Sequence, residues 1–494
     1  MKKLLCSSKQ HPLVRWLAEG QKTVAYPIFF AVACVISGMF GKEIYVPIFW
    51  LLCATVVFAA LFCDDLKVFL TPMLLIYYGL GQDRKPIYNE TTGNVYDTFD
   101  PDGLWHICIS GGVMIAAFLL RLLLDGTLRS ALTRRRPLTI GILAMDAAFL
   151  LGGLFSATYH PMNLLYGAFL AMGLTLFYTL TAAILERSRE VAPYACFVLV
   201  CLSWTAVAQF AVQFFRAWRV GLLFIRNEAG QWLFRRDMFQ LPWGISTLIG
   251  AVMVLGIPAA LYLARNKRFP WLSVLSACVF VGAALFHSRS AMAVGAFLLM
   301  GGLVLCCTGG RNKKQNRVTA IVLLLLVLAA LPVVHTVVYP LDQLWIKARE
   351  VLRLNSLMDN SRMELWKNGL ADFLARPIFG VGLWDGAYEQ VRQMDHLYSS
   401  MYHNIFVQWG AAFGIVGLGA FLFHLWEMGK QAWRHRSANH ALLLAVPAAL
   451  LALSLLDNFF FYLNFQILYT VFLVVSDTEQ MVSASSVDEK SLNG

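Results

Sequence analysis

Apolar runs of about 20 residues recur along the whole of this 494-residue chain. As an α-helix, each run is long enough to cross the roughly 30 Å hydrocarbon layer of a membrane. The runs are continuously apolar rather than alternating, which favours helices over a β-barrel. Charged residues make up only 14% of the chain, against about 25% in soluble domains. The sequence therefore predicts an all-α fold, a polytopic transmembrane helix bundle of about 12–14 spans.

Basic residues gather in the short links between these runs and set the expected topology. The net charge of +11 would suggest a nucleic-acid partner in a soluble protein, but here the positive-inside rule accounts for it. If the N-terminus is cytoplasmic, each predicted inside link is basic, for example 134–136, 265–268 and 430–436. We therefore expect a multi-pass protein of the inner (cytoplasmic) membrane with both termini cytoplasmic and no nucleic-acid partner.

The spacing of the spans divides the chain into four parts. A cytoplasmic N-terminal segment (1–25) precedes an N-terminal transmembrane bundle (26–214). A second transmembrane domain (215–475) includes a large, partly helical extracytoplasmic loop (339–403), and a polar, serine-rich tail (476–494) is expected to be disordered in the cytoplasm. Loops as long as 339–403 usually carry function, so we expect the functional site there.

Local order is predicted within that loop. Ser361 and Glu364 have the spacing of a capping box at the start of a helix. Apolar side chains then follow at helical spacing, and a proline and two glycines end the helix in a tight turn close to other backbone. These residues are Met363, Trp366, Leu370 and Phe373 for the apolar stripe, and Pro377, Gly380 and Gly382 for the turn. The pattern predicts a packed lid rather than a loose tether.

An arginine-rich stretch lies on the same predicted face of the membrane. The segment from Arg216 to Asp237 contains five arginines outside, against the usual bias. Binding of an anionic group is one explanation, and an interfacial amphipathic helix whose arginines meet lipid phosphates is the other. The link 287–290 and the long loop fall on this face too, so cations converge there and favour an anion site.

These motifs resemble the O-antigen ligase and polymerase family of lipid-linked glycan transferases. The resemblance covers about 216–425 and includes an arginine–tryptophan pair, a P-x-F-G-V-G turn, and a His-Asn pair followed nine residues later by G-x-x-G. The corresponding residues are Arg362 and Trp366; Pro377, Phe379, Gly380, Val381 and Gly382; His403 and Asn404; Gly414 and Gly417. Ser288-Arg289 resembles the start of another family span, and Arg235 or Arg236 before Pro242-Trp243-Gly244 is a weaker match.

The resemblance implies a fold of the GT-C-like type and an activity. The expected reaction is inverting, metal-independent transfer of a glycan from a polyprenyl (undecaprenyl) diphosphate donor to a hydroxyl of a lipid or glycan acceptor, with no cofactor. It would take place on the outer face of the membrane, in surface polysaccharide biosynthesis for the cell envelope. Ligase and polymerase differ mainly in the acceptor, and both remain open at this point.

Arginines are the expected stabilisers of the leaving diphosphate, because a guanidinium keeps its charge and binds phosphate through two parallel hydrogen bonds. Arg289 is the first choice, with the alternative that it only snorkels to the interface. Arg235, Arg236 and Arg362 are further diphosphate-binding candidates, although Arg362 has the alternative of pairing with Glu364 or Asp359.

His403 is the expected general base, because a neutral imidazole can take the proton of an acceptor hydroxyl near pH 7. The alternative is a hydrogen-bonded structural histidine. Asn404, Ser288 and Trp366 are expected to support the catalytic residues rather than touch substrate. The cysteines form no metal-ligand pattern, so no metal site is predicted.

Several other residues have plainer expected roles. Asp146, in the middle of a span, is expected to make an interhelical hydrogen bond. Gly414, Gly417 and Gly419 are expected to allow close helix packing, and His287 and His396 are read as structural. A carrier or flippase for a lipid-linked saccharide is the alternative function from another class, but such carriers place broken helices and charges at the midplane.

Overall fold

The structure is a computed structural model of the whole chain. It describes residues 11–39, 42–79, 87–88, 95–96, 101–126, 129, 136–156, 161–185, 188–221, 224–226, 232–234, 239, 241, 243–307, 361–383, 402–435 and 437–492. Several predictions lie outside these residues: the span Val318–Val338, the loop segments 339–360 and 384–401, Arg235, Arg236, Asp359 and His396.

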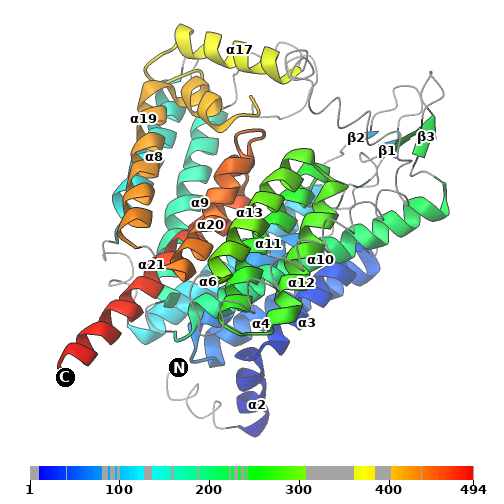
Figure 1. Cartoon of the computed structure of the whole chain (residues 1–494), viewed down its shortest axis with the longest axis vertical. Coiled ribbons are helices and arrows are strands. Elements are labelled where there is room, and N and C mark those ends of the chain that lie inside the picture. Colours follow the sequence, from blue (N-terminus) through cyan, green and yellow to red (C-terminus); the bar gives the residue numbers. More distant parts are fainter. Residues whose placement is uncertain are drawn as a thin grey trace.

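Helices dominate the described chain, as the sequence predicts (Figure 1). The N-terminal half contains α2 (Pro12–Gln21), α3 (Ala25–Met39), α4 (Lys42–Phe62), the broken helix η1 (Leu66–Phe69), α5 (Leu70–Leu75) and η2 (Ile76–Gly79), α6 (Pro101–Asp125), α8 (Thr139–Phe155), α9 (Pro161–Leu185) and α10 (Val191–Arg219). The C-terminal half contains α11 (Ser246–Arg265), α12 (Pro270–Leu285), α13 (Arg289–Cys307), α17 (Ser361–Ala375), α19 (Ile405–Arg434), α20 (Ala438–Leu453), η4 (Phe459–Phe461) and α21 (Leu463–Leu492).

Local signals explain where several of these helices begin. Pro101, Pro161 and Pro270 are the first residues of α6, α9 and α12, a position where a missing N–H costs nothing and the fixed φ suits a helix. Asn404 and Ser437 cap α19 and α20 through their side-chain oxygens. The sequence thus fixes these boundaries through its own chemistry.

The helices have the composition of a multi-pass membrane protein. Within the described residues, four helices are long and apolar enough to cross a membrane, or five if the bent pair α2–α3 counts as one. Seven further apolar helices are shorter, including those in α4, α8, α12, α13, α20 and α21. The predicted helical membrane bundle is confirmed, although fewer helices reach full spanning length than the 12–14 expected spans. Another of the shorter segments, Leu66–Gly79, is the broken helix of η1, α5 and η2.

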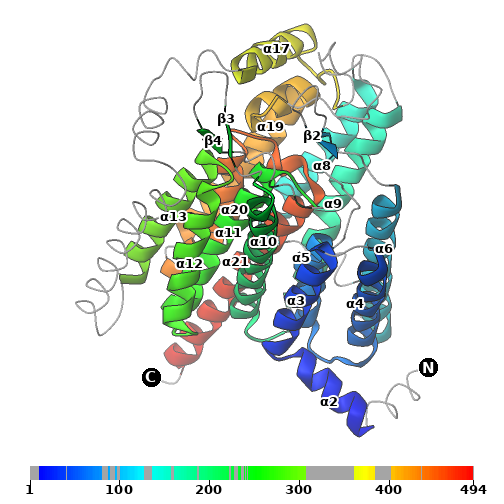
Figure 2. The same ribbon diagram turned by 90° about the vertical axis from the view of Figure 1, so that its right-hand side faces the viewer.

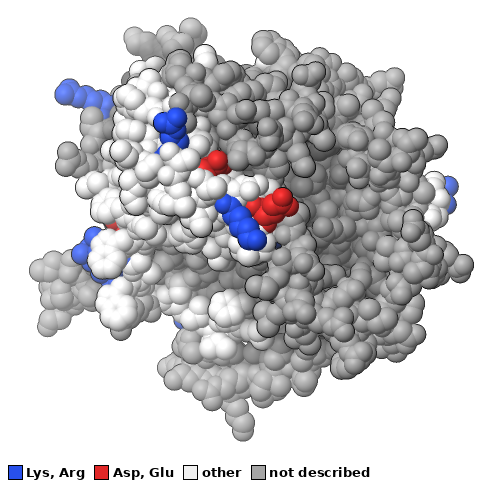
Figure 3. Space-filling view, turned by 90° about the horizontal axis from the view of Figure 1, so that it is seen from above, with Lys and Arg blue, Asp and Glu red and all other residues white. Residues whose placement is uncertain are grey.

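α11 lies at the centre of the C-terminal half, where it packs against α10, α12, α13 and α20. The polar helix α17 lies across one end of the bundle, beside the start of α19 (Figures 1 and 2). α2 and the C-terminal end of α21 lie at the other end in both views. Seen from the α17 end, the described surface carries both basic and acidic side chains (Figure 3).

One of the sequence-based expectations needs correction. Part of the arginine-rich stretch is not an amphipathic helix: α10 continues to Arg219, and β3 (Phe224–Arg226) then pairs with β4 (Trp232–Phe234) in a hairpin. A second hairpin joins β1 (Ile87–Tyr88) to β2 (Val95–Tyr96). α21 ends at Leu492, within the segment 476–494.

Candidate active site at the start of α19

The turn that follows α17 docks into a break in α19. Gly414 has a φ of +63°, which no helix interior allows, and the break exposes backbone groups on both sides. The N–H of Val381 donates to the carbonyl of Ala411 at 2.9 Å, and the N–H of Ile415 donates to the carbonyl of Pro377 at 2.7 Å. Backbone groups that the kink would otherwise leave unpaired are therefore satisfied by the predicted turn.

Glycines make this docking possible, as predicted for two of them. Gly380 and Gly382 have φ values of +75° and +90°, and a Cβ at either would overlap Ala412 or Asn163. The glycines of α19 differ from expectation. Gly414 contacts the backbone of the turn and Gly417 contacts side chains of its own helix, so neither packs a neighbouring span. Gly419 faces open space, and its expected packing role is wrong.

The docked turn holds α17 over the start of α19. Gly369 of α17 lies against the side chains of Tyr402 and Val407, and the Tyr402 hydroxyl donates to Asp372. The predicted lid is therefore a packed helix in its described part. Its apolar stripe is only partly right, since Leu370 is 57% exposed. Trp366 packs inward, and its indole N–H is buried and meets no hydrogen-bond acceptor.

Asn404 joins the start of α19 to the link between α20 and α21. Its side-chain oxygen accepts from the N–H groups of Phe406 and Val407 at 3.0 and 3.2 Å, and its side-chain nitrogen donates to the carbonyl of Leu455 at 3.0 Å. The N–H of Ile405 donates to the carbonyl of Ser454 at 2.8 Å. These bonds hold the link between α20 and α21 close to His403, the residue before Asn404.

His403 faces the carboxylate of Asp457. Its Nδ1 lies 2.9 Å from Oδ1 of Asp457, which also accepts from the N–H of Asn458 at 2.9 Å. The backbone of His403 has a φ of +52°, an uncommon conformation for a residue other than glycine. Such conformations persist where surrounding contacts impose them, and they cluster at functional sites.

Two opposing effects set the charge state of Asp457. Burial alone would raise the pKa of its carboxyl group, but the hydrogen bond and charge of His403, the N–H of Asn458 and the charge of Arg362 outweigh burial and lower the pKa below its ordinary value. Asp457 is therefore ionised at neutral pH. The charge of Arg362, on α17, is one of the effects that lower the pKa of Asp457. This effect favours neither of the two roles expected for Arg362, which are diphosphate binding and pairing with Glu364 or Asp359.

An ionised carboxylate can only accept hydrogen bonds, so a neutral His403 carries its proton on Nδ1. Nε2 is then a proton acceptor. The His403 side chain is 36% exposed whereas that of Asp457 is 10% exposed, so the imidazole is reachable while its partner is shielded. This arrangement, with a base held in one tautomer by a buried carboxylate, can take a proton from a hydroxyl.

Arg289, the first residue of α13, lies at the same end of the bundle as His403. Arg265 near the end of α11, Leu305 near the end of α13 and Ala432 near the end of α19 line one common cavity, so the three helices run in the same direction. Their first residues therefore share the opposite end, where His403 lies. The Arg289 side chain is outside the described residues, but Ser288 beside it accepts from the N–H of Ala291 at 3.3 Å and so starts α13.

His287 is buried next to this helix start. Its Nδ1 lies 3.0 Å from the Ser246 hydroxyl, and the ring packs on Phe210 with 4.4 Å between centroids. Burial lowers the pKa of His287 to about 3, so the imidazole is neutral. The contacts fit the structural role expected from the sequence.

The arginine-rich stretch is described only in part. Arg216 donates to the carbonyl of Met39 at 2.9 Å and so closes the end of α3 rather than facing a ligand. Asp146 accepts from the Thr175 hydroxyl of α9, which confirms the expected interhelical hydrogen bond. Among the described residues, no group of three or more His, Cys, Asp or Glu side chains is arranged to hold a metal ion.

The described helices have the composition of a multi-pass membrane protein, and the His403–Asp457 pair is a candidate proton-accepting site at one end of the bundle. Residues 271–422 match the model of a family described as O-antigen ligase, so this part of the chain is similar to an O-antigen ligase domain. The predicted resemblance is confirmed over that range. No curated protein matches the chain.

The matched range includes Arg289, Arg362 and His403, but Asp457 lies beyond its end. Reasoning from the sequence missed Asp457. One signal was present: the short link between the last two apolar runs contains a carboxylate. Two predicted spans separate this link from His403, so the chain returns to the face on which His403 lies. A carboxylate opposite a candidate base at one membrane face could have been paired with it.

Proposed function

We propose that the protein transfers a glycan from a polyprenyl diphosphate to an acceptor hydroxyl at the extracytoplasmic face of the cytoplasmic membrane, as an O-antigen ligase does. The observation that carries the proposal is the hydrogen bond between His403 and Asp457 within the reach of Arg362. It supplies a base in a defined tautomer at the end of the bundle where the lid lies. The ligase-type match over 271–422 supplies the reaction class.

In the proposed reaction His403 acts first on the acceptor. Nε2 takes the hydroxyl proton as the acceptor oxygen attacks the anomeric carbon, and Asp457 stabilises the imidazolium that forms. The bond between that carbon and the diphosphate oxygen breaks, and its electron pair leaves with the polyprenyl diphosphate. Attack opposite the leaving group inverts the configuration at the anomeric carbon.

Guanidinium groups are proposed to balance the charge that gathers on the diphosphate. Arg289, at the start of α13, is the first candidate, and Arg235 and Arg236 remain proposals from the sequence. Arg362 is proposed to lie between the His403–Asp457 pair and the diphosphate, since its charge helps to lower the pKa of Asp457. No step is assigned to a metal or a cofactor, because these side chains provide both the base and the cations.

The lid helix suits an amphipathic donor. Leu370, Leu374 and Ile378 leave α17 and its turn with apolar side chains that are 57%, 68% and 58% exposed. These side chains lie on the lid whose other side covers the start of α19. A donor with an apolar polyprenyl chain and a polar glycan would have both kinds of surface within reach.

The function is tested by complementing a deletion strain and sizing its surface glycan on a gel. Wild-type protein and His11→Ala, a change at the exposed histidine just before α2, should restore the glycan. His403→Ala and Arg289→Ala should not, although both variants insert into the membrane. A missing polymer on the acceptor with lipid-linked polymer accumulating indicates a ligase. Single repeats still attached to the acceptor indicate a polymerase. Restoration by both site variants would refute the proposal.

A flippase is the alternative from another class, and the described contacts favour it less. Asp146, the carboxylate predicted within a span, is bonded to Thr175 rather than facing a pathway. The His403–Asp457 pair lies at one end of the bundle, where surface chemistry takes place, and not at its midplane. In the deletion strain, lipid-linked glycan retained on the cytoplasmic side would favour the flippase and contradict the transferase.

A further inference from the structure

Gln408 lies in the first turn of α19, and its side chain joins two distant parts of the chain. The residue is 1% exposed. Its Oε1 accepts from the backbone N–H of Tyr402 at 3.0 Å and from Nδ2 of Asn458 at 2.9 Å. Tyr402 precedes His403 in the chain, and Asn458 follows Asp457. One amide oxygen therefore links the segment that carries the proposed base to the segment that carries its carboxylate.

The first of these bonds holds the backbone beside His403. Tyr402 is buried and lies before the first residue of α19, so its N–H is not part of the hydrogen bonding of that helix. Gln408 supplies the acceptor instead. Asn404 fixes the following peptide as the cap of α19, so His403 is held from both sides in its left-handed conformation. A buried N–H that lost this acceptor would move to find another partner, and the uncommon φ of His403 would relax with it.

The second bond holds the carboxylate. Asn458 is fully buried, and its backbone N–H donates to Oδ1 of Asp457 at 2.9 Å. The same Oδ1 lies 2.9 Å from Nδ1 of His403. A displacement of Asn458 would carry Asp457 with it, and a hydrogen bond weakens steeply once its alignment is lost. Gln408 therefore acts on both partners of the pair through one atom.

Packing alone does not explain a glutamine at this position. Burial of an amide costs free energy unless the amide is hydrogen-bonded, and Gln408 lies between the apolar Val407 and Trp409. Its oxygen can accept two bonds and carries no net charge, so it joins the two segments without a second negative charge beside Asp457. We propose that Gln408 is a positioning residue that sets the distance between His403 and Asp457. This role depends on the proposed function, in which the pair takes the proton of the acceptor hydroxyl.

The test compares kcat and KM of purified full-length variants. The lipid-linked glycan that accumulates in the deletion strain serves as the donor, and membrane lipids of the same strain supply the acceptor. Gln408→Met keeps the length of the side chain but removes the amide oxygen. We expect kcat to fall about 10- to 100-fold with the KM for the donor unchanged, since a misplacement of about 1 Å can cost about 100-fold in rate.

The matched control is Gln431→Met, near the other end of the same helix. Gln431 is 5% exposed, and neither polar atom of its side chain has a hydrogen-bond partner in the part of the chain that the structure describes. This variant exchanges the same two side chains in a buried position away from the His403–Asp457 pair. It should therefore keep the kcat of the wild type.

A double-mutant cycle separates positioning from a merely structural role. If Gln408 acts through the pair, Gln408→Met should cost little further kcat in an Asp457→Asn background, whereas a structural loss would add in full. If Gln408→Met does not fold, Gln408→Asn carries the test, because it keeps the amide but withdraws its oxygen. A wild-type kcat in the Gln408 variant, a change confined to KM, or full additivity overturns the proposal although His403→Ala still abolishes transfer. Transfer by His403→Ala at the wild-type rate would instead refute the proposed function itself.

Discussion

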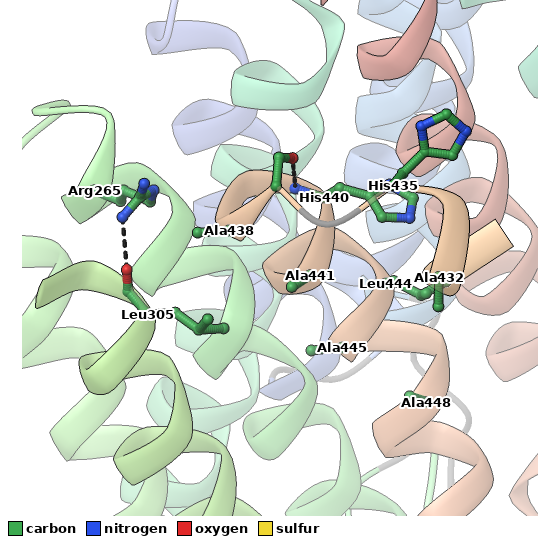
Figure 4. Close-up of a pocket in the computed structure, with 11 residues that line it drawn as sticks. Arg265, Leu305, Ala432, His435, Ala438, His440, Ala441, Leu444, Ala445 and Ala448 are labelled. Carbon is green, nitrogen blue, oxygen red and sulfur yellow. Dashed lines mark hydrogen bonds between the residues drawn. The ribbon is translucent and has the colours of Figure 1, made fainter. Parts of the chain in front are cut away.

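The two ends of α19 are built on different principles. At its start, His403 is bound by Asp457, and Asn404 by backbone groups on two elements. At its end, Ala432 and His435 line a cavity beside Arg265 (Figure 4), whose guanidinium donates to the carbonyl of Leu305 and to Oδ1 of Asn439. One end is closed by contacts within the protein, whereas the other opens on a cavity.

This difference follows from what the start of α19 is proposed to do. A general base works only in a fixed position and tautomer, and such precision requires supporting contacts around it. The break at Gly414 separates the two regions, so the docked turn can hold the start of α19 without constraining its end.

The sharpest test of the contrast removes the imidazole. His403→Ala should lower the rate of glycan transfer by roughly 100- to 10,000-fold, the range for loss of a general base. The rate is measured with purified protein and a lipid-linked donor, and His11→Ala is the control. A loss below ten-fold would mean that the ordered start of α19 is structural and that the chemistry lies elsewhere.

Much of the fold could be predicted because a membrane span is recognisable from the apolar composition of its own residues. α9, α12 and α13 are apolar along nearly their whole length, so apolar composition alone is enough to predict them as spans. The capping box and the glycine turn also predicted α17 and its end. In each case the information lies within a few neighbouring residues.

What could not be predicted depends on contacts between distant parts of the chain. The break at Gly414 is stabilised by carbonyl and N–H groups of Pro377 and Val381, and helix periodicity contains no trace of them. Asp457, the partner of His403, lies 54 positions later in the chain, and no local pattern in its short link connects the two residues. The hairpin of β3 and β4 replaces an expected helix for the same reason, since strand pairing is decided across the turn.

Changing the carboxylate alone tests whether it positions the base. Asp457→Asn keeps the size of the side chain but removes its charge, so the imidazole loses the partner that selects its tautomer. Transfer should fall by about 10- to 100-fold, the range seen when carboxylates that orient histidines are changed. A pH–rate profile distinguishes this from a structural loss, because a positioning role moves the profile whereas a loss of folded protein only scales it.

A milder comparison uses the two helix caps. Asn404 caps α19 at the proposed site, and Ser437 caps α20 at the other end by accepting from the N–H of His440. Each alanine substitution should cost about 1 kcal/mol of stability, read from thermal unfolding in detergent. Only Asn404→Ala should also slow transfer, because only this substitution removes contacts that hold the backbone next to His403 in place. Equal slowing by the two would show that the caps act through stability alone.

The smallest expected effect is the dependence of stability on pH at Asp457. Its pKa is lower in the folded protein than the ordinary value, near 4, of an unfolded chain. The stability it contributes is therefore fully present above that ordinary value and is lost as the pH falls through the lower, folded value. The difference in unfolding temperature between wild type and Asp457→Asn should accordingly shrink below about pH 4. In a His403→Ala background the dependence should flatten, since the imidazole is the main group that lowers this pKa against the effect of burial. A difference that stays constant with pH would show that the carboxylate gains nothing from its histidine.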